Sequence, residues 1–316
     1  MISQIIISFF QIIFILALAP LLSGIIKKIK AFFQIRKGAS IFQPYYDIAK
    51  LLRKDSVVSE NVSWIFHAAP VISFAAVLTA GLIVPVFISN MPFSFAGDLI
   101  AVIYLFALAR FFTALASLDA GSSFGGMGGS REMFVASMVE PALMLSIFAV
   151  ALNVGSTNLS HISQIVSAMG PSAISPYHLL AFVAFFIIAI AETGRIPVDN
   201  PATHLELTMI HEAMILEYSG KQLAIVELGA MVKQLLIFSL LVNIFLPWGI
   251  ANDVGFVNMA IALIVFLIKI IVIGALMAIV ETSTAKWRLF RLPDLLSVSL
   301  MLSFLSLVSF IIVKGG

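Results

Sequence analysis

Long stretches without charge constrain the fold of this chain more than any other feature of its sequence. No Asp, Glu, Lys or Arg occurs in residues 1–26, 61–97, 141–191, 234–252 or 295–313. A helix needs about 20 apolar residues to cross the hydrocarbon core of a bilayer, whereas barrel strands give alternating segments of about ten residues. The composition agrees, since 11% of the residues are charged against about 25% in soluble domains. These features predict an all-α integral membrane protein.

The apolar runs predict a single membrane domain over residues 1–316 that forms a bundle of eight transmembrane helices. The first run has no basic residue before its apolar core and no evident small-residue cleavage site, so we expect a retained helix instead of a signal peptide. Pro176 and Pro247 stand where the fifth helix would begin and the sixth would end. The eight helices are expected at about 3–26, 64–89, 97–119, 131–153, 176–194, 221–247, 254–280 and 294–313.

Basic residues are distributed unevenly between the two sets of connections. Eight lie between the first and second helices, and six more in the third, fifth and seventh connections bring that side to fourteen, whereas the other side has only Lys314. Because Lys and Arg near helix ends stay in the cytoplasm, both termini are predicted on the non-cytoplasmic side of the cytoplasmic (inner) membrane. The cytoplasmic loops are then about 27–63, 120–131, 195–220 and 281–293. These basic residues are spread over several loops and do not gather on one face of the protein, so they do not indicate nucleic-acid binding.

The chain contains no cysteine, which excludes thiolate-held iron-sulfur clusters and zinc sites. His204, His211 and Glu212 would share a helical face, but Ile215 stands where the zinc-protease pattern needs a second histidine. No metal site is therefore predicted. The glycine-rich residues 121–132 lack the Gly-Lys-Ser/Thr ending of a phosphate loop, and we expect a loop that packs closely on a partner or a flexible turn.

Charged residues within the predicted spans are the main candidates for function. An ionised side chain at the centre of a bilayer costs roughly 3 kcal/mol on insertion scales and usually marks an ion path, although an interhelical ion pair that only fixes packing is the alternative. Glu132 and Glu140 are eight positions apart, so on one helix they would lie about 80° apart around its axis and about 12 Å apart along it. The charged residues in or near the spans are Arg110, Glu132, Glu140, Glu192, Glu227, Lys233, Lys269 and Glu281.

Residues 191–220, AETGRIPVDNPATHLELTMIHEAMILEYSG, concentrate charge in an otherwise apolar chain. This segment resembles the connection between the fifth and sixth helices of the complex I subunit 1 family. The first cytoplasmic loop, RKGASIFQPYYDIAKLLRKD, is also similar to that of the family, as are Arg131 and Glu140 nine positions apart. GSSFGGMGGSREM and MIHEAM are typical of the hydrogenase-associated branch, to which the membrane subunits of hydrogenase-4 and formate hydrogenlyase belong.

The resemblance implies a membrane anchor and coupling subunit of a group 4 nickel-iron hydrogenase or related complex, without catalytic residues of its own. Iron-sulfur clusters and a nickel-iron centre would lie in a small and a large partner subunit, and antiporter-like membrane subunits would move protons or sodium ions. The residues implied in proton transfer or coupling are Glu132, Glu140, Glu192, Arg195, Asp199, Glu206, Glu212, Glu217, Glu227, Lys233 and Lys269. Those implied in docking the partner are Arg36, Lys37, Gln43, Asp47, Lys50 and Arg131.

Two other functions stay open at this point. A quinone-binding subunit of a complex I-type oxidoreductase would have a pocket among the first, fifth and sixth helices, but this chain lacks the Gly-Pro-Asn segment that quinone-reducing members have between Gly38 and Gln43. A stand-alone secondary transporter would be expected to show internal repeats and broken helices, and neither is evident.

Overall fold

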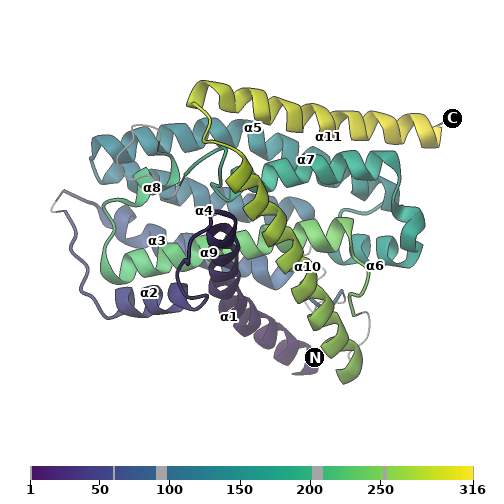
Figure 1. Cartoon of the computed structure of the whole chain (residues 1–316), viewed down its shortest axis with the longest axis horizontal. Helices are drawn as coiled ribbons and strands as arrows, with labels where there is room; N and C mark the ends of the chain where they lie inside the picture. The colour runs from purple at the N-terminus through teal and green to yellow at the C-terminus, as the bar shows by residue number, and fades with distance from the viewer. Residues whose placement is uncertain (1, 60, 90–97, 201–208, 252–254, 316) are drawn as a thin grey trace.

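The computed structural model describes residues 2–59, 61–89, 98–200, 209–251 and 255–315. These residues form helices joined by short connections (Figure 1). The long helices are α1 (Ile2–Phe33), α3 (Trp64–Ile83), α4 (Leu99–Asp119), α5 (Ser123–Val154), α7 (Pro176–Glu192), α9 (Gly220–Phe245), α10 (Phe256–Ser283) and α11 (Leu292–Gly315). The short ones are α2 (Gln43–Leu52), α6 (Leu159–Met169), α8 (His211–Ile215) and the 3-10 turns Gly170–Ala173 and Leu289–Arg291.

Each of the eight predicted helices corresponds to one of these long helices. Within the described residues, seven are long and apolar enough to cross a membrane, and α7, with 17 residues, is shorter. An all-helical membrane fold is therefore confirmed, while eight crossings and the side of the termini stay predictions. The apolar content of the runs was a sufficient signal because lipid-exposed helices must satisfy every backbone polar group within themselves.

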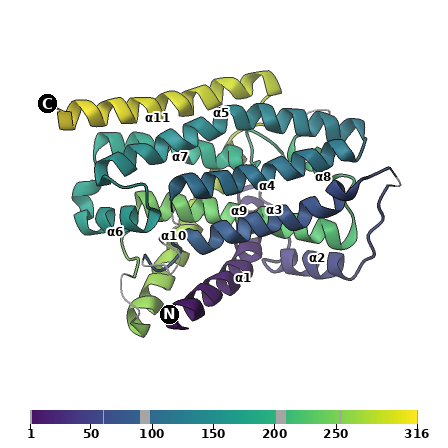
Figure 2. The same cartoon turned by 180° about the vertical axis from the view of Figure 1, so that it is seen from behind.

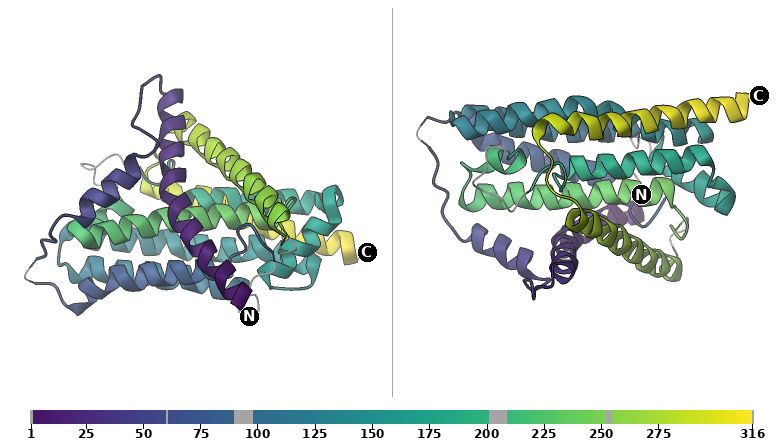
Figure 3. Two further views of the ribbon diagram at one scale, coloured as in Figure 1. Left: turned by 90° about the horizontal axis from the view of Figure 1, so that it is seen from below. Right: turned by 45° about the horizontal axis from the view of Figure 1, so that its top comes forward.

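The helices form a central bundle with α1 and α10 outside it. In Figure 2, α3 and α4 lie side by side, with α9 close to α3. Helix α11 packs along α5 and α7 on one side of the bundle, and α1 and α10 contact each other and α9 on the other side. Figure 3 shows α1 and α10 crossing the direction of the central helices obliquely. At one end of the bundle, the connections that follow α1, α7 and α10 bring together segments that are far apart in the sequence.

The glycine-rich residues predicted as a loop are instead helical from Ser123 onward, so α5 begins eight residues before the predicted start. Ser122 caps it, because its hydroxyl accepts the N–H of Gly125 at 3.1 Å. A Cβ on Gly128 would lie 2.8 Å from the Cβ of Ala213 in α8. The loop prediction is wrong because these glycines serve close helix packing, which depends on the partner helix and leaves no signal in the local sequence.

Hydroxyl groups join the outer helix α11 to the bundle. Ser303 donates a hydrogen bond to the carbonyl of Ala142 in α5 at 3.1 Å, and Ser306 donates to that of Tyr177 in α7 at 2.6 Å. Both serines are buried. Interhelical hydrogen bonds of this kind fix helix positions where apolar surface gives no advantage over lipid.

Helix α9 divides into a polar and an apolar half, and this division positions the site. Glu227, Lys233 and Gln234 lie in its part up to residue 234, whereas every residue from Leu235 to Phe245 is buried. The charged side chains of the site therefore lie near the middle of α4, α5 and α9 and at the end of α7.

Candidate functional site

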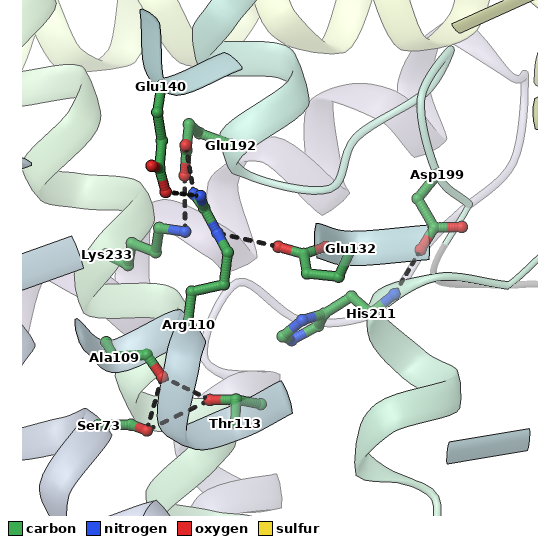
Figure 4. Close-up of polar contacts among 10 residues, drawn as sticks. All are labelled: Ser73, Ala109, Arg110, Thr113, Glu132, Glu140, Glu192, Asp199, His211 and Lys233. Atoms are coloured by element: carbon green, nitrogen blue, oxygen red, sulfur yellow. Dashed lines mark hydrogen bonds and ion pairs between the residues drawn. The ribbon is translucent and has the colours of Figure 1, made fainter. Parts of the chain in front are cut away.

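Arg110 of α4 is the centre of a buried ion-pair network (Figure 4). Its Nε lies 3.3 Å from a carboxylate oxygen of Glu132, and its two terminal nitrogens contact Glu140 and Glu192. Two of these carboxylates come from α5 and one from the end of α7. The arginine side chain is 5% exposed. A planar guanidinium presents five N–H donors, which allows one cation to hold three carboxylates from two helices.

Lys233 of α9 completes the network by pairing with Glu192 at 2.7 Å. Two cations, Arg110 and Lys233, thus face three carboxylates, so the network carries one negative charge when every group is ionised. An uncompensated charge is unfavourable where water is excluded. One bound proton would make the network neutral, so the network is a candidate for holding a single proton.

A small cavity of about 120 Å³ lies beside this network. Glu132, Glu192 and Lys233 line it, together with the hydroxyls of Ser73 and Thr113. Both hydroxyls donate to the carbonyl of Ala109 at 2.9 Å. A water molecule needs about 10–15 Å³ of such space and two to four polar partners, so the cavity is large and polar enough for a chain of waters.

A larger cavity of about 540 Å³ lies between α1, the 193–199 segment and α9. Its charged lining residues are Lys27, Lys30, Arg36, Arg195, Asp199, Glu212 and Glu227. The two cavities have five lining residues in common, which are Thr193, Gly194, His211, Ala230 and Gln234. These five residues form the wall between the two cavities, which we call the neck.

A second set of ion pairs holds the segment after α7. Arg195 lies 3.5 Å from Glu281 and donates to the amide oxygen of Gln234 at 2.8 Å. Glu281 also pairs with Lys30 of α1 at 2.8 Å. These contacts join the ends of α1, α7 and α10, three connections that the distribution of basic residues predicts on one side of the membrane.

Asp199 links this segment to α8 and to the connection after α10. One of its oxygens pairs with Lys286 at 3.0 Å, and the other accepts the backbone N–H groups of Ile210 and His211 at 3.2 and 3.0 Å. Asp199 is 2% exposed. A buried carboxylate with an ion pair and backbone donors fixes the groups that it contacts.

The end of the 191–220 segment is anchored on α3. The ring of Tyr218 stacks on Phe66 with centroids 4.1 Å apart, and its hydroxyl donates to the Phe66 carbonyl at 3.0 Å. Burial raises the pKa of the Tyr218 hydroxyl above its usual value of 10. The phenol thus stays a hydrogen-bond donor throughout the physiological pH range.

Some of the predicted coupling residues lie away from the network. Lys269 donates to the carbonyls of Leu246 and Trp248 after α9, where a cation meets the negative end of the helix. Glu227 and Glu212 line the larger cavity, and Glu217 is exposed. Glu206 and His204 lie outside the described residues.

The predicted docking residues divide into two groups. Arg36, Lys37 and Lys50 are exposed, and Asp47 is exposed and accepts a hydrogen bond from Gln43 at 2.8 Å within α2. Arg131 is half-buried instead and donates to the carbonyl of Met209 at 3.0 Å.

The sequence assigns no specific role to several residues of the site. Arg110 and Glu281 are recognisable only as charges in the spans, Lys30 and Lys286 only as basic residues of the loops, and Gln234 gives no signal. A single arginine within the apolar run of α4 is the clearest available indication. Across the residues that the structure covers, no group of three or more His, Cys, Asp or Glu is arranged to hold a metal ion.

Comparison with known proteins identifies the family. Residues 5–313 match the NADH dehydrogenase family. The chain belongs to this family. Hydrogenase-4 component C of Escherichia coli (strain K12) is 37% identical over 278 residues, which are 88% of this chain and 87% of that protein. Formate hydrogenlyase subunit 4 of the same organism is 35% identical over 299 residues, 95% of this chain and 96% of that protein.

A solved structure agrees with this assignment at the level of the fold. A chain in the structure of the membrane-bound sulfane sulfur reductase, an archaeal respiratory membrane complex, superposes with a TM-score of 0.86 over 98% of this chain and 99% of that one, at 21% identity. The resemblance to the complex I subunit 1 family and its hydrogenase-associated branch is thus confirmed by the family match and the two relatives. The family match extends over nearly the whole chain.

Proposed function

We propose that this chain is the coupling subunit in the membrane part of a group 4 hydrogenase-like complex, where it converts redox events in soluble partners into proton movement. Its homologues in hydrogenase-4 and formate hydrogenlyase support membership of such a complex. The observation that carries the coupling role is the Arg110 network, which has one excess negative charge beside a cavity of about 120 Å³. Proton uptake and release at this network would be the chemical step that the chain performs.

The proton would enter from the larger cavity and leave through Glu140. The Glu140 side chain is 37% exposed although it contacts the buried Arg110. Exposed Ser137 and Pro141 flank it on α5. An ionised group facing lipid costs roughly 3 kcal/mol on insertion scales, and this cost favours a membrane partner that covers the face and accepts the proton. An antiporter-like subunit fits this role.

The soluble partners would dock on the first loop and α2, where Arg36, Lys37 and Lys50 are exposed. A cluster-bearing small subunit and a large subunit would supply iron-sulfur clusters and a nickel-iron centre, because the chain has no cysteine to hold them. Turnover in these subunits would displace the segment around Arg195 and Asp199, which ion pairs with Glu281 and Lys286 hold in place.

Quinone reduction is the second candidate function. The larger cavity of about 540 Å³ lies between α1, the end of α7 and α9, the position that the quinone alternative predicts, and its volume falls within the usual range of about 300–1,000 Å³ for small-molecule sites. A quinone that co-purifies with the complex and is displaced by the substitution Arg195→Trp would favour this candidate.

The coupling role is tested by Glu140→Gln in the intact complex, reconstituted into vesicles that contain the pH indicator pyranine. With reduced methyl viologen as electron donor, Glu140→Gln should preserve assembly but reduce the number of protons moved per electron. Asp294→Asn, which removes an exposed carboxylate at the start of α11, is the matched control. Proton movement at the wild-type ratio in Glu140→Gln would contradict the role of the network.

A further inference from the structure

The neck between the two cavities contains one side chain that is able to carry a proton. Of the five residues that line both cavities, Gly194 and Ala230 have no polar side-chain atom, and the Thr193 hydroxyl donates to the carbonyl of Ala189 at 2.6 Å. The amide of Gln234 has no acidic or basic group and accepts a hydrogen bond from Arg195. His211 is the fifth residue, and histidine both accepts and donates a proton near neutral pH.

The backbone and the ring of His211 have separate surroundings. Figure 4 shows the ring on the Arg110 side of its backbone, whereas the backbone N–H is directed to Asp199. The ring nitrogens make no hydrogen bond or ion pair to any other residue within the described part of the chain. His211 is half-buried and lines both cavities, so its imidazole is available for proton exchange with water.

Charged groups from every neighbouring element face the two cavities that His211 lines. The smaller cavity contributes Arg110, Glu132, Glu192 and Lys233, and the larger one Lys27, Lys30, Arg36, Arg195, Asp199, Glu212 and Glu227. A proton that leaves His211 toward the smaller cavity meets a network with one excess negative charge. The network therefore attracts the proton from the neck.

We propose that His211 is the proton-transfer residue between the two cavities and that Asp199 is the positioning residue that holds it at the neck. This inference rests on the proposed function of the Arg110 network. The imidazole takes a proton from water in the larger cavity at one ring nitrogen and releases a proton from the other nitrogen to water in the smaller cavity. The proton then reaches a carboxylate of the network, and the ring returns to its neutral form.

Asp199 would connect this transfer to events at the docking side. Its carboxylate fixes the His211 backbone and is itself fixed by Lys286, so a shift of the 195–199 segment moves the imidazole relative to the neck. Gly194 permits the turn before this segment, because its φ of +57° lies in the region that favours glycine. Redox-driven displacement of the segment would therefore change proton transfer without altering the network itself.

Chemical rescue separates a proton-transfer role from a structural one. The complex with His211→Ala or His211→Gln should assemble and oxidise reduced methyl viologen, but its initial rate of proton movement in pyranine-loaded vesicles should fall at least about tenfold, since general acid-base groups contribute about 10²–10⁴-fold. Added imidazole should restore a large part of the rate in His211→Ala and leave the wild type unchanged. His161→Gln removes an exposed histidine of α6 and should have no effect.

Lys286→Ala tests the positioning role. It should slow proton movement less than His211→Ala does, and imidazole should not restore the rate because the ring is still present. A wild-type rate in either His211 variant, or a loss in His211→Ala that imidazole does not restore, would overturn the proposal for His211. If His211→Ala does not assemble, His211→Gln decides by its rate alone. Loss of proton movement in Glu140→Gln together with a wild-type rate in His211→Gln would remove this inference and leave the proposed function intact.

Discussion

Removal of the Arg110 cation gives the most direct test of the network. In Arg110→Gln, the three carboxylates of Glu132, Glu140 and Glu192 retain only Lys233 as a cation, so the excess charge of the ionised network rises from one to two. Breaking a buried ion pair by deleting one partner costs about 3–5 kcal/mol. Because the Arg110 side chain is 5% exposed, we expect a destabilisation in this range.

A second substitution separates the electrostatic effect from loss of packing. Adding Glu132→Gln to Arg110→Gln lowers the excess charge again to one, so the double variant should be more stable than Arg110→Gln alone. If the loss came from packing, the second substitution would leave the stability unchanged or reduce it further. The interaction energy of this double-mutant cycle should be about 0.5–3 kcal/mol, the range found for residues in one network.

The assay measures the apparent melting temperature of the detergent-solubilised complex. The signal is the loss of partner subunits after heating, detected by size-exclusion chromatography. Arg288→Gln, which removes an exposed arginine, serves as the control and should melt like the wild type. A wild-type melting temperature in Arg110→Gln, or a double variant that is no more stable than Arg110→Gln, would refute the charge argument.

Three further predictions follow from particular contacts. Ser306→Ala should lower the stability by about 0.6 kcal/mol, visible as a small decrease in melting temperature, because it removes the hydrogen bond to the Tyr177 carbonyl. Gly128→Val should displace α8 and lower the proton-to-electron ratio in vesicles, since a Cβ at this position would already lie 2.8 Å from that of Ala213, whereas Gly126→Val, where the nearest atom would lie 4.0 Å away, should keep the wild-type ratio. Tyr218→Phe should cost about 1 kcal/mol. Because burial raises the Tyr218 pKa, ionisation favours the unfolded chain, and the wild type should lose stability as the pH rises above about 10 whereas Tyr218→Phe should lose less over the same titration.

The sequence predicted the long helices well, because the lipid environment favours helical structure in each apolar run. Continuous apolar runs located each long helix, because a chain in hydrocarbon must satisfy its backbone within a helix. It failed at residues 123–130, where glycine has a poor intrinsic helix propensity and Gly128 is in close contact with α8. The short helix α2 was likewise predicted only as part of a loop, since ten residues give a weak periodic signal.

Charge inside an apolar run identified the types of residue in the site but not their pairing. Arg110 and Glu140 could be selected from the sequence because each is costly in a membrane. Their contact depends on the packing of α4 against α5, and the contact of Lys233 with Glu192 depends on that of α9 against α7.

The sequence by itself thus determined that the chain lies in lipid, where its long helices are, to which family it belongs and which residues carry a charge that needs compensation. These properties follow from local composition and from order along the chain. Only the tertiary structure decided that three carboxylates share one arginine, that His211 lines two cavities and that Asp199 holds its backbone. Arg110 and Glu192 alone are 82 positions apart in the sequence, and no local pattern encodes the distance between two helices that pack through other side chains.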